Sequence, residues 1–281
     1  MDGVRPRLTP LLLAASLLLA ACDGGVPVAS PSSPALPSTE VTPTQPSPSA
    51  PAPPPSPSPS SPSKVTAGKV VVLDPGHNGG NGSHLPEINR QVPAGRGQTK
   101  PCNTTGTSTN AGYPEHAFTW DVAQRVGKAL SAKGIKVVYT RPDDSGTGPC
   151  VDQRAGIGNE ANADAVVSIH ADGSNSAGAQ GFHVAYSSPP LNAAQRDPSI
   201  SLAKMLRDTL VADGLTVANY IASNGLAPRN DLAGLNLSTR PAALVECGNM
   251  RNAAEAAQMT SAEGRQRYAA AITAAIETYL A

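Results

Sequence analysis

Short apolar runs alternate with amphipathic helical patterns over the carboxyl-terminal part of this chain. The apolar runs are typical of strands covered on both faces, and they lie at Lys69–Leu73, Ile135–Thr140, Ala165–Ile169, Gly181–Tyr186 and Ala242–Cys247. Helical patterns lie at Pro114–Lys133, Asp152–Ala161, Ser199–Ala212 and Gly264–Leu280. This alternation predicts a single α/β domain, with a mostly parallel, twisted sheet flanked by helices on both faces.

The amino-terminal segment has the features of an export signal. Arg5 and Arg7 precede an apolar run that is too short for an ordinary membrane span, as in secretory signal peptides. The run ends in Leu-Ala-Ala-Cys at Leu19–Cys22, which resembles the lipobox of bacterial lipoproteins. We therefore expect a signal peptide at residues 1–21 and a diacylated thiol on Cys22. The alternative is a plain signal peptide in which Cys22 is incidental.

A Pro/Ser-rich segment follows this signal. Residues 26–63 are almost all Pro, Ser, Ala and Thr, a composition that buries too little apolar surface to offset the entropy lost on ordering. We expect residues 22–63 to form a disordered linker, partly in polyproline II. Residues 64–281 remain as one folded domain of sufficient length for a sizeable core. The formal net charge is zero, which gives no indication of nucleic-acid binding.

The remaining cysteines fit an exported protein. Cys102 and Cys150 lie in polar stretches that also contain proline. In an oxidising compartment we expect these two to form a disulfide. Cys247 lies within an apolar run and is expected to be a buried thiol.

Three polar side chains lie at or near the ends of predicted strands. His77 follows the first strand within four residues, His170 closes the run AVVSIH, and Glu246 lies late in AALVECG. Ligand sites in open α/β sheets gather at the carboxyl ends of strands. Two imidazoles and a carboxylate suit Zn²⁺, and a catalytic zinc ion keeps its fourth position for water.

One zinc ligand is still needed, and Glu115 is the candidate. It lies in the first turn of the predicted helix Pro114–Lys133, three residues before Phe118 on the inward-facing stripe. A glutamate in a first turn also complements the helix dipole. Spacing alone does not separate these two roles for Glu115.

Six motifs carry a resemblance to a known family. They occur in the order VVVLDPGHNGG, YPEHAFTWDVAQRVGKAL, KVVYTRPDD, QRAGIGNEANADAVVSIHADGS, GFHVAY and PAALVECGNMRN. Together they resemble the zinc-dependent N-acetylmuramoyl-L-alanine amidases (Amidase_3) over residues 69–280. The resemblance implies one Zn²⁺ per chain held by His77, Glu115 and His170, with Glu246 as the catalytic glutamate. Residues 64–281 would then be the amidase catalytic domain, with a zinc amidase/peptidase-like fold.

The activity implied by the resemblance is hydrolysis of the amide between N-acetylmuramic acid and L-alanine in peptidoglycan. The expected partner is peptidoglycan or a muropeptide, without nucleic acid, and we expect a monomer. With Cys22 lipidated, the protein would be anchored to the outer face of the cytoplasmic membrane and face the cell wall. One departure from the family is the segment Asn78–Pro114, which is longer than usual and rich in Gly, Asn and Thr.

Other functions remain open at this stage. One is a lipid-anchored wall-binding protein without catalysis, although aromatic residues, on which sugar-binding modules rely, make up only 3% of the chain. Another is a different zinc peptidase or a deacetylase that acts on peptidoglycan. A cysteine peptidase using Cys247 and His170 is a third, but alternation along a strand places Cys247 and Glu246 on opposite faces.

Several other polar residues are predicted to lie outside the metal site. We expect His84, His116 and His183 not to be ligands; His183 begins a strand, which is the wrong end if that strand is parallel. Arg141 and Arg154 are expected to form ion pairs, with Asp143, Asp144 or Asp152 as the candidate partners. Arg229 and Asn236 precede the Glu246 strand and are candidates for substrate contact.

Overall fold

The structure is a computed structural model that describes Thr66 and residues 68–281. The predicted signal peptide, Cys22 and the linker at 22–63 lie outside the described residues. Among the helices in the described part of the chain, none combines the length and the apolar character needed to cross a membrane.

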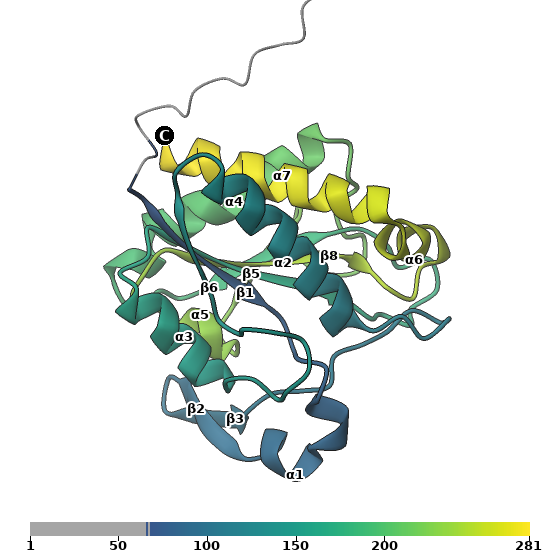
Figure 1. Cartoon of the computed structure of the whole chain (residues 1–281), viewed down its shortest axis with the longest axis horizontal. Coiled ribbons are helices and arrows are strands. Elements are labelled where there is room, and N and C mark those ends of the chain that lie inside the picture. The colour runs from purple at the N-terminus through teal and green to yellow at the C-terminus, as the bar shows by residue number, and fades with distance from the viewer. Residues whose placement is uncertain (1–65, 67) are drawn as a thin grey trace, which may run out of the picture. The chain divides into compact units, whose positions relative to one another are not determined.

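A six-stranded sheet in the order β4-β1-β5-β8-β6-β7 forms the centre of the domain (Figure 1). Its strands are β1 Val70–Pro75, β4 Lys136–Tyr139, β5 Ala165–Asp172, β6 His183–Ser187, β7 Leu226–Arg229 and β8 Ala242–Asn249. Strands β4, β1, β5 and β8 are parallel, whereas β6 is antiparallel to β8 and parallel to β7. The predicted mostly parallel sheet is therefore confirmed. Strand β7 escaped prediction because it is only four residues long and contains Pro228.

Three long helices cover one face of this sheet: α2 (Glu115–Ser131), α4 (Asp197–Ala212) and α7 (Ala262–Leu280) (Figure 1). The apolar stripe of α2 explains its place, because Phe118 and Val122 are fully buried against the strand residues of that face. Burial of such stripes supplies most of the stabilisation of amphipathic helices. The helix α6 (Ala253–Thr260) connects β8 to α7.

The helices on the opposite face are shorter: α3 (Val151–Glu160) and the four-residue α5 (Ala233–Asn236). The segment between His77 and α2 extends this layer, and Figure 1 shows it beside these two helices. It contains the short elements η1 Asn81–Ser83, α1 Leu85–Ile88, β2 Gln91–Gly95 and β3 Gln98–Pro101. A further short helix, η2 (Ala193–Gln195), precedes α4.

The segment at residues 78–114, called the insertion below, contains a hairpin formed by β2 and β3. Contacts at both ends of this hairpin hold the insertion to the rest of the domain. Asn236 Nδ2 donates to the Ala94 carbonyl oxygen at 3.0 Å, and Arg96 Nε at the hairpin turn donates to Asn236 Oδ1 at 3.2 Å. At the other end, the predicted disulfide between Cys102 and Cys150 is confirmed and joins the insertion to the start of α3. Asn236 is therefore a buried structural residue that supports the hairpin.

Candidate active site

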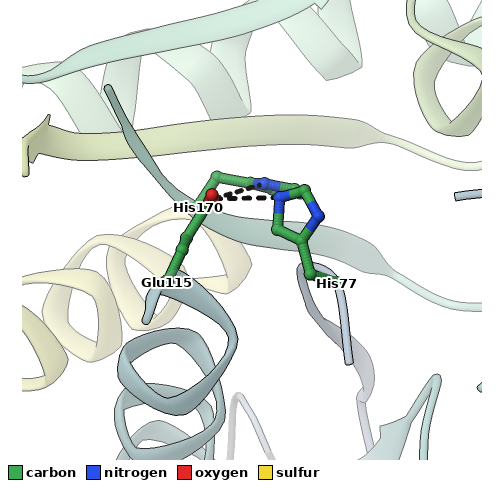
Figure 2. A group of neighbouring side chains, drawn as sticks. All are labelled: His77, Glu115 and His170. Carbon is green, nitrogen blue, oxygen red and sulfur yellow. Dashed lines mark hydrogen bonds and ion pairs between the residues drawn. The ribbon is translucent and has the colours of Figure 1, made fainter. Parts of the chain in front are cut away.

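The residues predicted from strand ends lie at the carboxyl edge of the sheet, and Figure 2 shows two of them, His77 and His170, beside Glu115. His77 lies two residues beyond β1, and His170 lies in β5. Glu115 is the first residue of α2, so its side chain reaches the sheet edge from a separate element. Glu246 in β8 is the register partner of His170, which places the two side chains on the same face of the sheet.

Glu115 lies between the two imidazole rings. Its Oε1 is 3.1 Å from His77 Nε2 and 3.0 Å from His170 Nδ1. Candidate ligand atoms of the three residues all lie within 4.8 Å of one another. The prediction that these three side chains form one group that could hold a metal is therefore in accord with the geometry.

Backbone groups orient this trio. Glu115 Oε2 accepts a hydrogen bond from the Thr107 N–H at 2.9 Å, and Oε1 accepts one from the Ala171 N–H at 3.1 Å. His77 Nδ1 is 3.0 Å from the Thr104 carbonyl oxygen, which can only accept, so this nitrogen carries the proton. In the neutral imidazole the lone pair of His77 is then on Nε2, the nitrogen that faces Glu115.

A glycine makes room for the ring of His170. A Cβ on Gly76 would come within 2.3 Å of His170 Cε1 and within 2.5 Å of its Nδ1. Any side chain at this position would displace the imidazole. Gly76 is therefore required by the close approach of the β1 end to β5.

The electrostatics of the trio fit a divalent cation. Burial would raise the pKa of Glu115, but the imidazoles of His77 and His170 outweigh burial and hold that pKa below its ordinary value. The site therefore offers one carboxylate and two imidazoles in a buried position, and zinc binds both of these donor types. The residues present fit such an ion.

Glu246 differs from Glu115 in having no hydrogen-bond or ion-pair partner among the described residues. Its Oε2 is buried, and no hydrogen-bond partner for it exists among the residues the structure describes. Burial raises the pKa of Glu246 well above the ordinary value, and the negative charges of Glu115 and Asp172 raise it further, while Arg229 opposes them. A carboxylate in this environment has an increased affinity for a proton.

Cys247 lies on the other face of β8. It is buried in the large apolar cluster with Val245, and burial raises the pKa of its thiol well above the ordinary value. A nucleophilic cysteine needs the opposite shift. The geometry does not bring Cys247 together with His170, in agreement with the predicted alternation.

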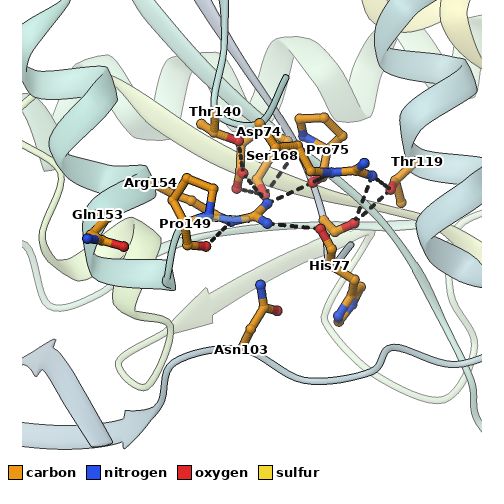
Figure 3. A network of polar contacts seen from close by, with 12 residues as sticks. Asp74, Pro75, His77, Asn103, Thr119, Thr140, Pro149, Gln153, Arg154 and Ser168 are labelled. Atoms are coloured by element: carbon orange, nitrogen blue, oxygen red, sulfur yellow. Dashed lines mark hydrogen bonds and ion pairs between the residues drawn. The ribbon is translucent and has the colours of Figure 1, made fainter. Parts of the chain in front are cut away.

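A buried ion pair supports the end of β1 (Figure 3). Arg154 Nη1 donates to Asp74 Oδ1 at 2.9 Å and to the Pro75 carbonyl oxygen at 2.7 Å, and its Nη2 donates to the His77 carbonyl oxygen at 2.9 Å. Asp152 is thus not the partner of Arg154. The Arg154 side chain extends from α3 toward the end of β1, where it contacts Asp74. The predicted pair between Arg141 and Asp144 is present.

A cavity of about 350 Å³ adjoins the trio. Glu246 and the metal-capable group line one part of it, and apolar residues such as Leu235 and Leu244 line another. The insertion also contributes, through Lys100 and Asn103. The segment between His77 and Glu115 therefore forms part of the cavity wall.

His183 requires a correction. Because β6 is antiparallel to β8, its first residue lies at the same sheet edge as Glu246 and is the register partner of that glutamate. His183 would lie far from the site only if β6 ran parallel to β8, and it does not. His183 is still not in the metal-capable group, and burial lowers its pKa to about 4.

The other two excluded histidines are engaged elsewhere. His84 Nδ1 is 2.8 Å from the Gly80 carbonyl oxygen, and His116 Nδ1 is 2.7 Å from Asp144 Oδ2.

Asp172 lies near Glu246 and was not predicted from the sequence. Its Oδ2 accepts a hydrogen bond from the Tyr220 hydroxyl at 2.9 Å. Its position two residues after His170 in the same strand was the available signal.

Two histidines and a glutamate that could hold a metal, beside a buried glutamate that can take a proton, are groups suited to metal-assisted hydrolysis. The family model described as N-acetylmuramoyl-L-alanine amidase matches residues 71–278. The chain therefore belongs to this family, and it is an enzyme, as the six motifs predicted.

Similar proteins agree with this assignment. The chain is 53% identical over 215 residues to N-acetylmuramoyl-L-alanine amidase Rv3717 of Mycobacterium tuberculosis, covering 76% of this chain and 88% of that protein. The crystal structure of the amidase Ami1 from Mycobacterium smegmatis matches with a TM-score of 0.74 and 54% identity, covering 76% of this chain and 98% of the other. Ami1 from Mycobacterium abscessus matches with the same TM-score and 55% identity, covering 76% and 100%.

Proposed function

We propose that this enzyme holds one zinc ion through His77, Glu115 and His170 and hydrolyses the amide between N-acetylmuramic acid and L-alanine, with Glu246 as the general base. The observation that supports the proposal most strongly is the position of Glu115 Oε1, about 3 Å from a nitrogen of each imidazole. When bound, zinc acidifies a water molecule and polarises the amide carbonyl. The residues of the chain supply the remaining steps.

Orientation of the ligands is one task of the chain. The Thr104 carbonyl oxygen fixes the tautomer of His77, and the N–H groups of Thr107 and Ala171 hold both oxygens of Glu115. Partners of this kind position metal ligands and raise their affinity for the ion. Thr104 and Thr107 belong to the insertion, so the insertion also supports the metal site.

Proton transfer is the task assigned to Glu246. A carboxylate with a raised pKa accepts the proton of the attacking water more readily and donates it to the leaving amine of L-alanine in the second half of the reaction. Its buried Oε2 has no partner within the described part of the chain, so no protein donor competes for the carboxylate. The cavity beside it provides space for the substrate.

Mass spectrometry of digested muropeptides tests the proposed bond. The expected products are a peptide with a free amino-terminal L-alanine and a saccharide with a free lactyl carboxylate. Loss of an acetyl group, or cleavage within the peptide, would instead indicate the deacetylase or peptidase alternative. Metal analysis of the purified enzyme before and after chelation, followed by restoration of activity with zinc, tests the cofactor.

Export and lipid anchoring extend the proposal beyond the described residues. We expect residues 1–21 to be removed, Cys22 to be lipidated, residues 22–63 to serve as a linker, and residues 64–281 to act as a monomer on the wall. Labelling of the protein with a radioactive fatty acid in cells, compared with a Cys22→Ala variant, tests the anchor. Equal release of both proteins into the medium would contradict it.

A further inference from the structure

A second cavity lies at the same edge of the sheet and has a different chemistry. Its volume is about 320 Å³, and its lining is dominated by amide, hydroxyl and guanidinium groups, notably Asn110, Ser174, Asn175, Asn249, Arg251 and Asn252. The remaining residues of its wall are serine, alanine and glycine. Within the described part of the chain, neither a carboxylate nor an aromatic side chain lines it.

The two cavities are neighbours. Gly173 lines the first cavity and Ser174 the second, and Asn249 of the second cavity is three residues beyond Glu246 in β8. A Cβ on Gly173 would come within 2.2 Å of Thr107 Oγ1. Gly173 thus leaves room for the Thr107 side chain, which packs on the backbone between the two cavities.

The shape of the second cavity is fixed by hydrogen bonds. Asn249 Nδ2 donates to the Ser174 and Ala179 carbonyl oxygens, each at 2.9 Å, and so holds the loop after β5 in place. Asn252 Oδ1 accepts hydrogen bonds from the first N–H groups of α6. These two amides are therefore used to build the wall.

Other donors in the cavity remain available. Arg251 Nε is buried and has no hydrogen-bond partner among the described residues, while its Nη1 donates to Asn110 Oδ1 at a long 3.3 Å. Asn175 is exposed, and its side-chain amide makes no hydrogen bond to any described residue. A buried donor without a partner is costly in a folded protein. The Arg251 side chain as a whole is only partly buried and lines the cavity, so a ligand that carries acceptor oxygens can reach its guanidinium group.

We infer that this second cavity binds the saccharide on the muramoyl side of the scissile amide, an inference that rests on the proposed function. Sugar hydroxyl and acetamido groups both donate and accept, and so match asparagine amides and a guanidinium. The first cavity has an apolar wall and one lysine, Lys100, facing it from the insertion, which suits an aliphatic peptide with an acidic group. The polar second cavity would therefore hold the saccharide and the partly apolar first cavity the peptide, with the scissile amide between them at the metal site.

The test compares two substrates with the same peptide, one carrying the GlcNAc–MurNAc disaccharide and one carrying only a lactoyl group. For Arg251→Ala combined with Asn175→Ala, KM for the disaccharide substrate should rise about tenfold, with kcat nearly unchanged. The kinetics of the lactoyl substrate should not change. The matched control is Arg267→Ala, an exposed arginine paired with Asp213 outside both cavities, and it should leave both substrates unaffected.

A second measurement uses the peptide-free disaccharide as a probe. Titration of the zinc-loaded wild type should shift side-chain amide signals of the second cavity in NMR spectra, and the double variant should lose these shifts. Equal KM increases for both substrates would assign the cavity to the peptide and overturn the inference, as would unchanged kinetics. If the wild type cleaved neither substrate, the proposed function would fail, while saccharide binding would still be decided by the titration.

Discussion

The two faces of the sheet differ in how many buried apolar residues pack against them. The face that carries Val71 and Val245 lies under three long helices and belongs to the larger apolar cluster. The face that carries Val72 and Ala242 lies under α3 and the four-residue α5, and its cluster is smaller. The cavity beside the metal-capable group opens on this second face.

This difference suggests a division of roles. Glu246 shares its face with Ala242 and Leu244, which line the cavity, whereas Cys247 faces the larger core. A deep core stabilises the fold, while incomplete coverage on the other side leaves space for substrate. Substitutions on the two faces should therefore change different measured quantities.

The largest effect on stability is expected from a matched pair of leucine substitutions. Leu206 on α4 is fully buried in the larger cluster, so Leu206→Ala should lower the free energy of unfolding by roughly 3 to 5 kcal/mol. Leu235 on α5 borders the cavity, so Leu235→Ala should cost about 2 kcal/mol and raise KM. Urea unfolding and steady-state kinetics measure both; equal losses of stability would contradict the contrast between the faces.

Removal of the disulfide tests the insertion on the thinly covered face. The bond closes a loop with a sequence separation of 48, so replacing Cys102 and Cys150 by serine should lower stability by about 4 kcal/mol on the chain-entropy model. Because residues of the insertion line the cavity, activity should also change when the bond is reduced, before the core unfolds. Unchanged kinetics with the bond shown to be broken would mean that it serves stability alone.

Glu246→Gln tests the proton transfer on the same face. Turnover should fall at least about a hundredfold, because glutamine cannot accept the proton of water, while the zinc content should not change. Cys247→Ser, on the opposite face of the same strand, is the control and should retain activity in the folded protein. Loss of zinc in Glu246→Gln would instead identify Glu246 as a ligand, and a rate near that of the wild type would remove it from the mechanism.

Most of the sheet could be predicted from the sequence, because buried strands must be apolar and their runs are short. The same runs located His77, His170 and Glu246, since side chains at strand ends meet at one edge of a parallel sheet. Glu115 is different: its role depends on where α2 begins relative to two strands, and local spacing leaves it ambiguous. The family resemblance was needed to select it.

Other features of the site could not be predicted for physical reasons. The direction of β6 is not contained in its own pattern, since a strand has the same alternation in either direction, so the place of His183 beside Glu246 was missed. The hairpin of the insertion is polar and short, and it is held by long-range contacts such as that between Arg96 and Asn236. The partner of Arg154 is likewise set by tertiary packing.

The last prediction concerns the ion pair between Asp74 and Arg154 near His77. Burial would raise the pKa of Asp74, but Arg154 and the hydroxyls of Ser168 and Thr140 lower it from 3.8 to about 2. The folded pKa lies below the unfolded one, so this stabilisation is present above the unfolded value and is lost as the pH falls through about 2. It amounts to about 2.5 kcal/mol. Asp74→Asn should be less stable at every pH, because Arg154 is left buried without its partner. Between pH 6 and pH 2 it should lose about 2 kcal/mol less than the wild type in urea unfolding, since about half of the Asp74 carboxylates are still ionised at pH 2. Parallel pH profiles would show that Asp74 titrates alike in the folded and unfolded states.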